Sequence, residues 1–399
     1  MAEVVCPWCF GTFDSLKMQF RCINPRCGKE KDEPYSEYHG LTTPRSMARV
    51  MDPVESVFER LSNKDLDSVP CSSCSVETNK KICPLCHNQL PDTAGKHRHY
   101  IIVVVGSKES GKSHFIAVLL NSLRQEIGAD LDASLMPLND DTIERYQREF
   151  YDPIFRDRTV LDATRSLAGH SEGKAPLIFC LKLRQRGMLG RDHFEVMTLV
   201  FFDTAGEDLD NVDLLQVEAK YIARADGIIF LVDPLQIPAV RDHTSGVPLP
   251  GDHTDPATIV GKLARVVRGV RHMDVVEPIR TPLAFTLSKI DAVQRMLPPG
   301  SSILGDSGHG NRFDVRGFER SSQEIRSRLC DWYGDSGALV RDVEHNFRDC
   351  GYFAVSALGS SPDSTGQLGL GVAPFRIGDP LLWLMWKRGL IDDKDERGD

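Results

Sequence analysis

The strongest structural signal in this chain of 399 residues is the segment Tyr100-Ile101-Ile102-Val103-Val104-Val105-Gly106-Ser107-Lys108-Glu109-Ser110-Gly111-Lys112-Ser113. A run of β-forming residues enters G-x-x-x-x-G-K-S, and an apolar run suited to a helix follows at 115–123. Strand, glycine loop and helix in this order predict a phosphate-binding loop, because backbone N–H groups and a helix N-terminus can then surround anionic oxygens. The alternative is a plain glycine turn between a buried strand and a helix.

Each position of this loop has an expected role. Gly106, Ser110 and Gly111 would wrap the phosphates. Lys112 would reach the β- and γ-phosphates and serve catalysis, and the Ser113 hydroxyl would bind Mg²⁺.

Composition and charge narrow the class of protein. A hydrophobic content of 41% and a charged content of 26% are ordinary for a soluble chain of about two domains. No apolar run approaches the 18 or so residues that span a bilayer, and the N-terminus lacks the features of a signal peptide. We therefore expect a cytoplasmic protein with no membrane partner. The net charge of −9 disfavours nonspecific binding to nucleic acid.

Eight of the eleven cysteines lie within the first 86 residues. In a reducing compartment, paired C-x-x-C units indicate metal more often than disulfide, and four thiolates leave no open position on a zinc ion. We predict two structural Zn²⁺ sites with ligands grouped in chain order: Cys6, Cys9, Cys22 and Cys27, then Cys71, Cys74, Cys83 and Cys86. Redox or buried thiols are the alternative. The histidines His87, His97 and His99 could substitute as ligands, although solvated or strand positions suit them better.

Residues 1–98 are predicted to form these two zinc-ribbon-like modules. The modules would be joined by a polar linker at 29–34 and a short helix carrying Val54, Val57, Phe58 and Leu61 on one face. This region holds 13 Lys+Arg and 13 Asp+Glu, so no basic face for DNA is evident. Its aromatic residues could form either a docking face for a protein partner or the core around the first metal: Trp8, Phe10, Phe13 and Phe20.

Residues 99–399 are predicted to form the nucleotide-binding domain. Further strands are expected at 177–183, 194–202, 227–232, 283–287 and 352–355, and helices at 214–223, 257–270 and 318–332. The alternation predicts an α/β, doubly wound, mostly parallel sheet with ligands at the carboxyl ends of its strands. The segments 234–256, 298–311 and 359–374 resemble insertions or mobile loops, and 381–386 a buried closing helix.

A second ligand position follows the strand at 194–202. Val200-Phe201-Phe202-Asp203-Thr204-Ala205-Gly206-Glu207 places a carboxylate directly after a buried strand. Asp203 would hold Mg²⁺ through water, and the Gly206 N–H would meet the γ-phosphate. An ordinary strand-to-turn transition is the alternative, since Asp and Gly are common in turns.

Together these motifs resemble those of the Ras-like GTPases of the translation-factor-related class. Gly106–Ser113 matches their first motif and Asp203–Gly206 their third. Ser288-Lys289-Ile290-Asp291 is similar to the guanine motif N/T-K-x-D, and Ser356-Ala357-Leu358 to the fifth motif. The resemblance covers residues 100–390 and implies GTP or GDP with Mg²⁺ as ligands. A carboxylate at Asp291 can accept two hydrogen bonds from guanine, whereas adenine would leave it unpaired.

The resemblance also implies roles for the remaining positions, and two departures qualify it. Lys289 would cover the base face, and the Ala357 N–H would meet guanine O6. Ser288 replaces the usual Asn, and Glu207 stands where many members have the Gln that orients water. The threonine that closes on Mg²⁺ would be Thr164, with Thr159 as the other candidate. Arg156, Arg158 or Arg165 could supply an arginine finger in cis, although most arginines in such segments are simply solvated.

The zinc-bearing N-terminus and the ending Asp379-Pro380-Leu381-Leu382-Trp383-Leu384 look like the bacterial double-GTPase families. Those families are linked to conflict or signalling systems. The resemblance implies a slowly hydrolysing GTP switch whose zinc ribbons recruit a partner protein. The alternative is a zinc-dependent nucleic-acid-binding protein with an NTPase remodelling domain, which the neutral N-terminal region and the guanine motif disfavour.

Overall fold

The structure is a computed structural model. It describes residues 3–53, 67–107, 109–161, 176–186, 192–202, 215–244, 249–251, 255–310, 312–334, 337–363, 365–369 and 371–395. The expected helix at 54–61 lies outside these residues.

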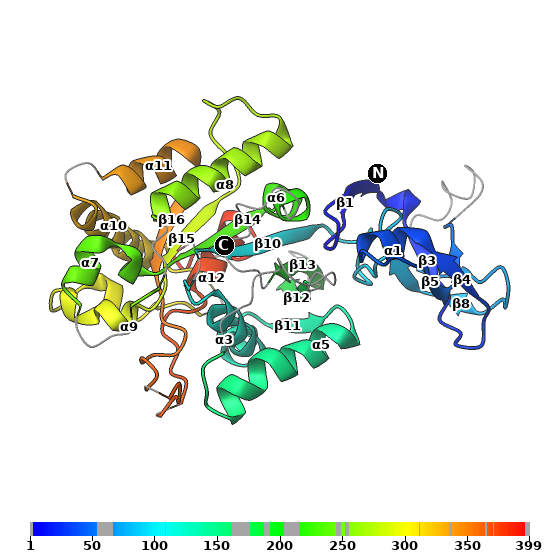
Figure 1. Ribbon diagram of the computed structural model, residues 1–399, viewed down its shortest axis with the longest axis horizontal. Helices are drawn as coiled ribbons and strands as arrows, with labels where there is room; N and C mark the ends of the chain where they lie inside the picture. Colours follow the sequence, from blue (N-terminus) through cyan, green and yellow to red (C-terminus); the bar gives the residue numbers. More distant parts are fainter. Residues whose placement is uncertain are drawn as a thin grey trace.

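A seven-stranded sheet forms the centre of the larger part of the molecule (Figure 1). Its strands, in spatial order, are β11 (Ala133–Pro137), β12 (Leu177–Arg186), β13 (Asp192–Phe201), β10 (His99–Gly106), β14 (Gly227–Val232), β15 (Leu283–Leu287) and β16 (Cys350–Ala354). The five strands from β13 to β16 run parallel, and β11 and β12 add an antiparallel edge. Because the order reverses at β10, a crevice for a ligand is expected at the carboxyl end of this strand.

Helices cover both faces of the sheet. This agrees with β10, whose alternate apolar side chains point to opposite faces and are buried on both. Ile101 and Val103 pack with one cluster and Ile102 and Val104 with the other. The first face carries α6 (Leu215–Ala223), α8 (Pro256–Arg271) and α11 (Ala338–Asn346). The second carries α3 (Lys112–Arg124), the π-helical η2 (Gln147–Arg156) and α12 (Asp379–Lys387), and α10 (Val315–Trp332) contributes to both. The shorter helices are α4 (Glu126–Asp130), α5 (Asp140–Tyr146), α7 (Pro238–Asp242), α9 (Ile290–Val293), η4 (Pro234–Gln236), η5 (Gln294–Met296) and η6 (Ser302–Leu304).

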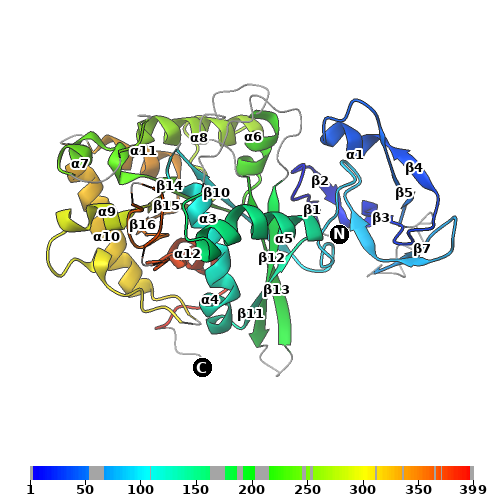
Figure 2. The ribbon, with the colours of Figure 1, turned by 60° about the horizontal axis from the view of Figure 1, so that its bottom comes forward.

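The N-terminal part is built from short strands and turns and lies at one end of the molecule (Figures 1 and 2). Strand β3 (Gln19–Arg21) lies between β6 (Val50–Met51) and β9 (Lys80–Ile82). Three two-stranded pairs surround them: β1 (Glu3–Val5) with β2 (Thr12–Asp14), β4 (Lys29–Asp32) with β5 (Arg45–Ala48), and β7 (Val69–Pro70) with β8 (Glu77–Thr78). Two short helices complete it, η1 (Ser15–Lys17) and α1 (Glu33–Tyr38).

The fold class predicted from the sequence is confirmed: a doubly wound, mostly parallel α/β sheet with small cysteine-rich modules at the N-terminus. The closing helix is confirmed as α12, in which Trp383 and Leu384 are buried. Two expectations were wrong, and one feature of the sheet was not predicted. The polar linker at 29–34 is instead strand β4 and the start of α1, because Asp32 turns inward. The antiparallel edge was not foreseen. The segment at 234–256 begins with a buried turn rather than a loose loop, since Leu235 and Gln236 are almost fully covered.

Candidate nucleotide site and metal centres

The predicted phosphate loop lies at the carboxyl end of β10, where the sheet order reverses. A Cβ added at Gly106 would lie 2.6 Å from Ser110 Oγ and 2.9 Å from Leu231 O, so only glycine fits there. Gly111 has φ +78° and is followed by the first residues of α3, Lys112 and Ser113. The turn therefore aims the N-terminus of a 13-residue helix at the loop, which suits a polyphosphate.

The buried Ser110 gives a further test of this loop. Its Oγ has no hydrogen-bond partner within the part of the chain that the structure describes, although the side chain is almost fully covered. Buried hydroxyls are normally paired, so a site with an unpaired one fits a ligand that brings acceptor oxygens. The expected phosphate group meets that requirement.

The predicted base-recognition residues come together from two different loops. Ser356 Oγ donates to Asp291 Oδ1 at 2.5 Å, and the Ile290 N–H donates to Val355 O at 3.1 Å. The loop after β15 and the loop after β16 are thus joined at the same edge of the sheet. Ala357 follows directly in the second loop and is half-buried.

Lys289 connects this region with the phosphate loop. Its backbone is left-handed, with φ +49°, and its Nζ donates to Glu109 O at 2.9 Å. Ser288, the departure from the usual Asn, is buried, and both its N–H and its hydroxyl donate to Val232 O, at 2.9 and 3.2 Å. The serine thus ties its loop to β14.

Several expected site residues lie outside the described residues, namely Thr164, Arg165, Asp203, Gly206 and Glu207. Thr159, the other threonine candidate, is described, and both its N–H and its hydroxyl donate to Pro153 O. Arg156 pairs with Asp152 at 3.2 Å.

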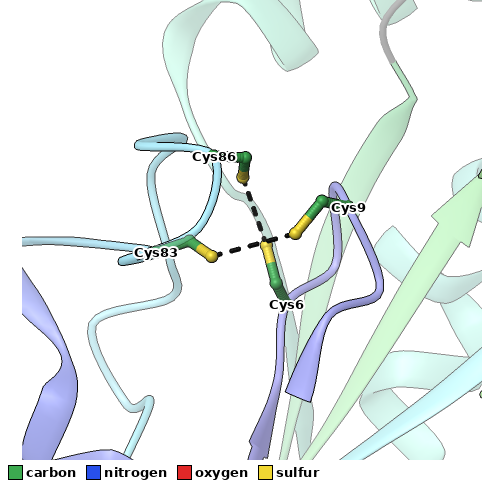
Figure 3. A group of neighbouring side chains, drawn as sticks. All are labelled: Cys6, Cys9, Cys83 and Cys86. Carbon is green, nitrogen blue, oxygen red and sulfur yellow. Dashed lines mark hydrogen bonds between the residues drawn. The ribbon is translucent and has the colours of Figure 1, made fainter. Parts of the chain in front are cut away.

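The eight N-terminal cysteines form two groups of four, but the ligand sets predicted in chain order were wrong. Cys6 and Cys9 join Cys83 and Cys86, and Cys22 and Cys27 join Cys71 and Cys74. Figure 3 shows the first group, with the sulfur atoms facing one another. The pairing is crossed because β3 pairs with β9, which brings the first hook of the chain beside the last.

The sulfur geometry fits a metal ion well. Cys6 Sγ lies 3.7 Å from Cys86 Sγ, and Cys9 Sγ 3.9 Å from Cys83 Sγ. In the second group Cys22 Sγ and Cys74 Sγ are 3.7 Å apart. A tetrahedron of zinc–sulfur bonds of about 2.3 Å has edges of about 3.8 Å, so both groups could hold Zn²⁺. All eight thiols are free of disulfides.

The three histidines considered as substitute ligands have other partners or positions. His87 Nδ1 contacts Asp32 Oδ1 at 2.8 Å, and His99 contacts Thr198 and Thr93. His97 donates its backbone N–H to Thr93 O. Both sulfur groups consist of cysteine alone.

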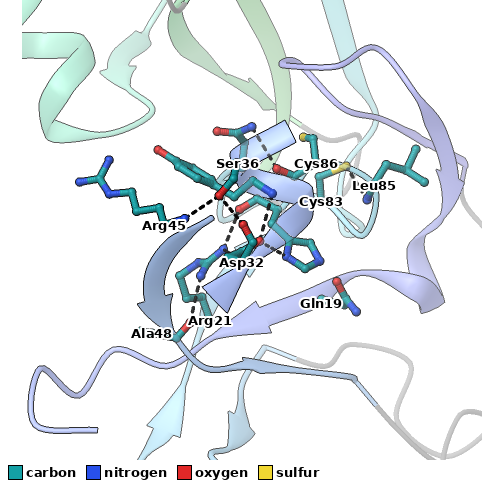
Figure 4. Close-up of polar contacts among 12 residues, drawn as sticks. Gln19, Arg21, Asp32, Ser36, Arg45, Ala48, Cys83, Leu85 and Cys86 are labelled. Atoms are coloured by element: carbon teal, nitrogen blue, oxygen red, sulfur yellow. Dashed lines mark hydrogen bonds and ion pairs between the residues drawn. The ribbon is translucent and has the colours of Figure 1, made fainter. Parts of the chain in front are cut away.

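A buried ion pair between Arg21 and Asp32 connects residues that lie next to the two sulfur groups (Figure 4). Arg21, next to Cys22, donates to Asp32 Oδ2 at 2.6 Å and to His87 O at 3.0 Å, and His87 follows Cys86. Burial opposes the charge on Asp32, but the hydrogen bonds from Arg21 and the Tyr35 N–H outweigh it and lower the pKa of this carboxyl. The two modules are therefore one connected unit. Sequence reasoning missed this pair because Asp32 lies in an apparently solvated charge run.

The first sulfur group also packs against the large sheet. The Phe10 ring lies 6.0 Å from Phe202 and 5.3 Å from Tyr221, between centroids, and Phe202 and Tyr221 are 4.8 Å apart. Tyr221 Oη donates to Val200 O, which anchors α6 to β13. Of the two uses considered for the N-terminal aromatic residues, Phe10 therefore serves as core, shared with the sheet.

Comparisons with known proteins give one clear relative. A protein of Mycolicibacterium smegmatis named "Putative ESX-1 scaffolding and assembly protein SaeC" is 28% identical over 331 residues, which cover 78% of this chain and 80% of the relative. No family model matches the chain. No helix in the described ranges is long and apolar enough to cross a membrane.

Solved structures show weaker likeness. The chain aligns with a signal recognition particle receptor SRb-GTP/SRX complex from Chaetomium thermophilum (12% identity, TM-score 0.29, 66% of this chain and 93% of that one). It also aligns with the Arl6 BBS3 small GTPase from Trypanosoma brucei (13%, 0.28, 73% and 98%) and with a bacterial selenocysteine-specific elongation factor, EF-Sec (13%, 0.26, 73% and 28%). Scores this low add nothing to the fold that the sheet order already shows.

Proposed function

We propose that this chain is a GTP-binding, slowly hydrolysing molecular switch whose N-terminal zinc modules recruit a partner protein. One observation carries the proposal. Lys289 and Asp291, which follow one strand, meet the phosphate loop through Glu109 O and the loop of the next strand through Ser356. The carboxylate proposed to bind the base and the loop proposed to bind phosphate are thereby joined at the carboxyl edge of one sheet, where a nucleotide would bind.

The ligands of this proposal follow from the residues present. Lys112, Gly106 and Gly111 would hold the phosphates, with Mg²⁺ on Ser113 and Asp203. Asp291, Lys289 and the Ala357 N–H would read guanine. Thr164 is proposed to close on Mg²⁺, and Glu207 to lie beside the γ-phosphate. Two Zn²⁺ would fill the sulfur groups, and a reducing, cytosolic compartment would keep these thiolates available.

Partner recruitment draws support from the M. smegmatis relative, whose name describes scaffolding and assembly. We propose a comparable role here, with residues 1–98 as the recruiting part and 99–399 as the switch. The narrower membership in the double-GTPase families belongs to this proposal as well.

Titration of the purified protein with GTP, ATP and XTP tests the choice of base. We expect GTP to bind at least about tenfold more tightly than ATP, because adenine leaves Asp291 unpaired. Asp291→Asn should shift the preference toward XTP, whose C2 oxygen accepts from an amide. Equal affinity of the wild type for ATP and GTP would refute the assignment.

Hydrolysis is tested separately by single-turnover kinetics. A carboxylate at Glu207 would add negative charge where the transition state already carries it, so the intrinsic rate should be slow. Glu207→Gln should bind GTP as the wild type does and hydrolyse it at an equal or higher rate, whereas Lys112→Ala should lose tight binding. A large loss of rate in Glu207→Gln would show that Glu207 is the working catalytic base. The proposal of a slowly hydrolysing switch would then be wrong.

A further inference from the structure

A buried carboxylate lies beside the candidate site and has no role in the account above. Asp233 directly follows β14 and is completely buried. Its Oδ1 accepts from the Leu235 N–H at 2.8 Å, and its Oδ2 accepts from Lys289 Nζ at 2.6 Å. A buried charge is tolerated only when it is paired, so this carboxylate and the Lys289 ammonium are placed by each other.

The same turn holds the phosphate loop at two points. Lys289 Nζ, fixed by Asp233, also donates to Glu109 O at 2.9 Å. Three residues after Asp233, Gln236 Oε1 accepts from Ser107 Oγ at 2.7 Å, and both side chains are buried. The turn 233–236 therefore contacts the phosphate loop directly at Ser107 and, through Lys289, at Glu109.

We infer that Asp233 is a positioning residue for the nucleotide. It holds the Lys289 ammonium against the phosphate loop, so that the lysine stem stays where a base would stack and the loop keeps its shape. Asp233 itself would not touch the ligand. The inference rests on the proposed function, because it assigns a role in nucleotide binding.

A double-mutant cycle tests this role with a fluorescent GTP analogue and Mg²⁺. Asp233→Asn should weaken binding about tenfold, because the amide cannot balance the ammonium. Lys289→Met should weaken binding as well. The double variant should bind no more weakly than Lys289→Met alone, because residues that act through one contact are non-additive. Asp242→Asn, the same change at an exposed position on α7, should leave the affinity unchanged.

Additive losses, or an unchanged affinity in Asp233→Asn, would overturn the inference. If Asp233→Asn alone does not fold, the comparison of Lys289→Met with the double variant still decides, because a further loss in the double variant would show that Asp233 acts without Lys289. Thermal unfolding without nucleotide separates loss of affinity from loss of fold. A wild type that binds ATP as tightly as GTP would refute only the base assignment, whereas a wild type that binds no nucleotide would refute both proposals.

Discussion

The half-buried His99 shows how single polar side chains hold strand β10. Its Nδ1 contacts Thr198 Oγ1 on β13 at 2.9 Å, and its Nε2 contacts Thr93 Oγ1 at 3.1 Å in the segment that arrives from the second C-x-x-C hook of the first group. Burial lowers the pKa of His99 to about 4. At the other end of the strand, Ser107 is held by Gln236. Both ends of β10 are thus set by side chains from distant segments.

The pKa of His99 predicts a pH dependence of stability. The unfolded chain binds a proton on this histidine near pH 6.5, whereas the folded chain resists until about pH 4. The contribution of His99 to the free energy of unfolding is therefore complete above pH 6.5. It falls by about 1.4 kcal/mol for each pH unit between pH 6.5 and about pH 4. In the His99→Gln variant, the free energy of unfolding should therefore depend less steeply on pH than in the wild type. Urea unfolding at pH 6.5 and at pH 5.0 measures this slope. His193→Gln, at an exposed histidine of β13, should keep the wild-type slope, and an equal slope in all three proteins would contradict the assignment.

At the scale of elements, three of the four cysteine hooks use the same turn. In each, the residue four after the first cysteine donates its N–H to that cysteine's carbonyl, and it has a left-handed backbone: Phe10, Ser75 and His87, with φ of +54°, +58° and +51°. The fourth hook, Cys22 to Cys27, is longer. Its Cys27 N–H donates to Asn24 O, and its Cys22 N–H donates to Arg49 O. The hooks are local structures, but their assignment to the two sulfur groups is set by strand pairing.

Zinc counting distinguishes the crossed ligand sets from sets in chain order. Replacing Cys6, Cys9, Cys83 and Cys86 together by serine should leave about one zinc per chain, because the second group stays whole. Replacing Cys6, Cys9, Cys22 and Cys27 should leave none, because each group loses two ligands. The wild type should carry about two zincs by elemental analysis under reducing conditions. The reverse pattern for the two quadruple variants would restore the sets in chain order.

For the whole molecule, the decisive contact is that between the first sulfur group and the sheet. Phe10 belongs to the same apolar cluster as Phe202, Tyr221 and the residues of β10 that point to this face of the sheet. The side chain of Gln89, in the same region, also donates to Leu138 O at 3.3 Å. Folding of the module around the first sulfur group and packing of α6 against β13 should therefore be energetically coupled.

Phe10→Ala measures this coupling. Truncation of a buried Phe costs about 3 to 5 kcal/mol, so the variant should unfold earlier and the module should separate from the sheet in an additional transition. Leu85→Ala, at a half-exposed position in the last hook, should change the free energy of unfolding by less than about 1 kcal/mol. Calorimetry together with the zinc content separates loss of packing from loss of metal. If both variants behave alike, Phe10 does not link the two parts.

The sequence by itself determined the elements whose signals are local. The strands at 227–232 and 283–287 were predicted with their observed bounds, because continuous apolar runs end at clear turn residues. The glycine turn between β10 and α3 was predicted for the same reason, since its glycines follow directly from the backbone shape that the turn needs. The number of sulfur groups also followed from the short spacing within each hook.

Tertiary structure alone decided the contacts between distant segments. The crossed cysteine sets, the antiparallel β11–β12 edge and the packing of Phe10 each join residues far apart in the chain. Asp233 carried the same signal as Asp203, a carboxylate after a buried strand, but its partner Lys289 lies 56 positions away. A local pattern fixes the backbone near a residue, whereas its partner depends on how strands order themselves in the sheet.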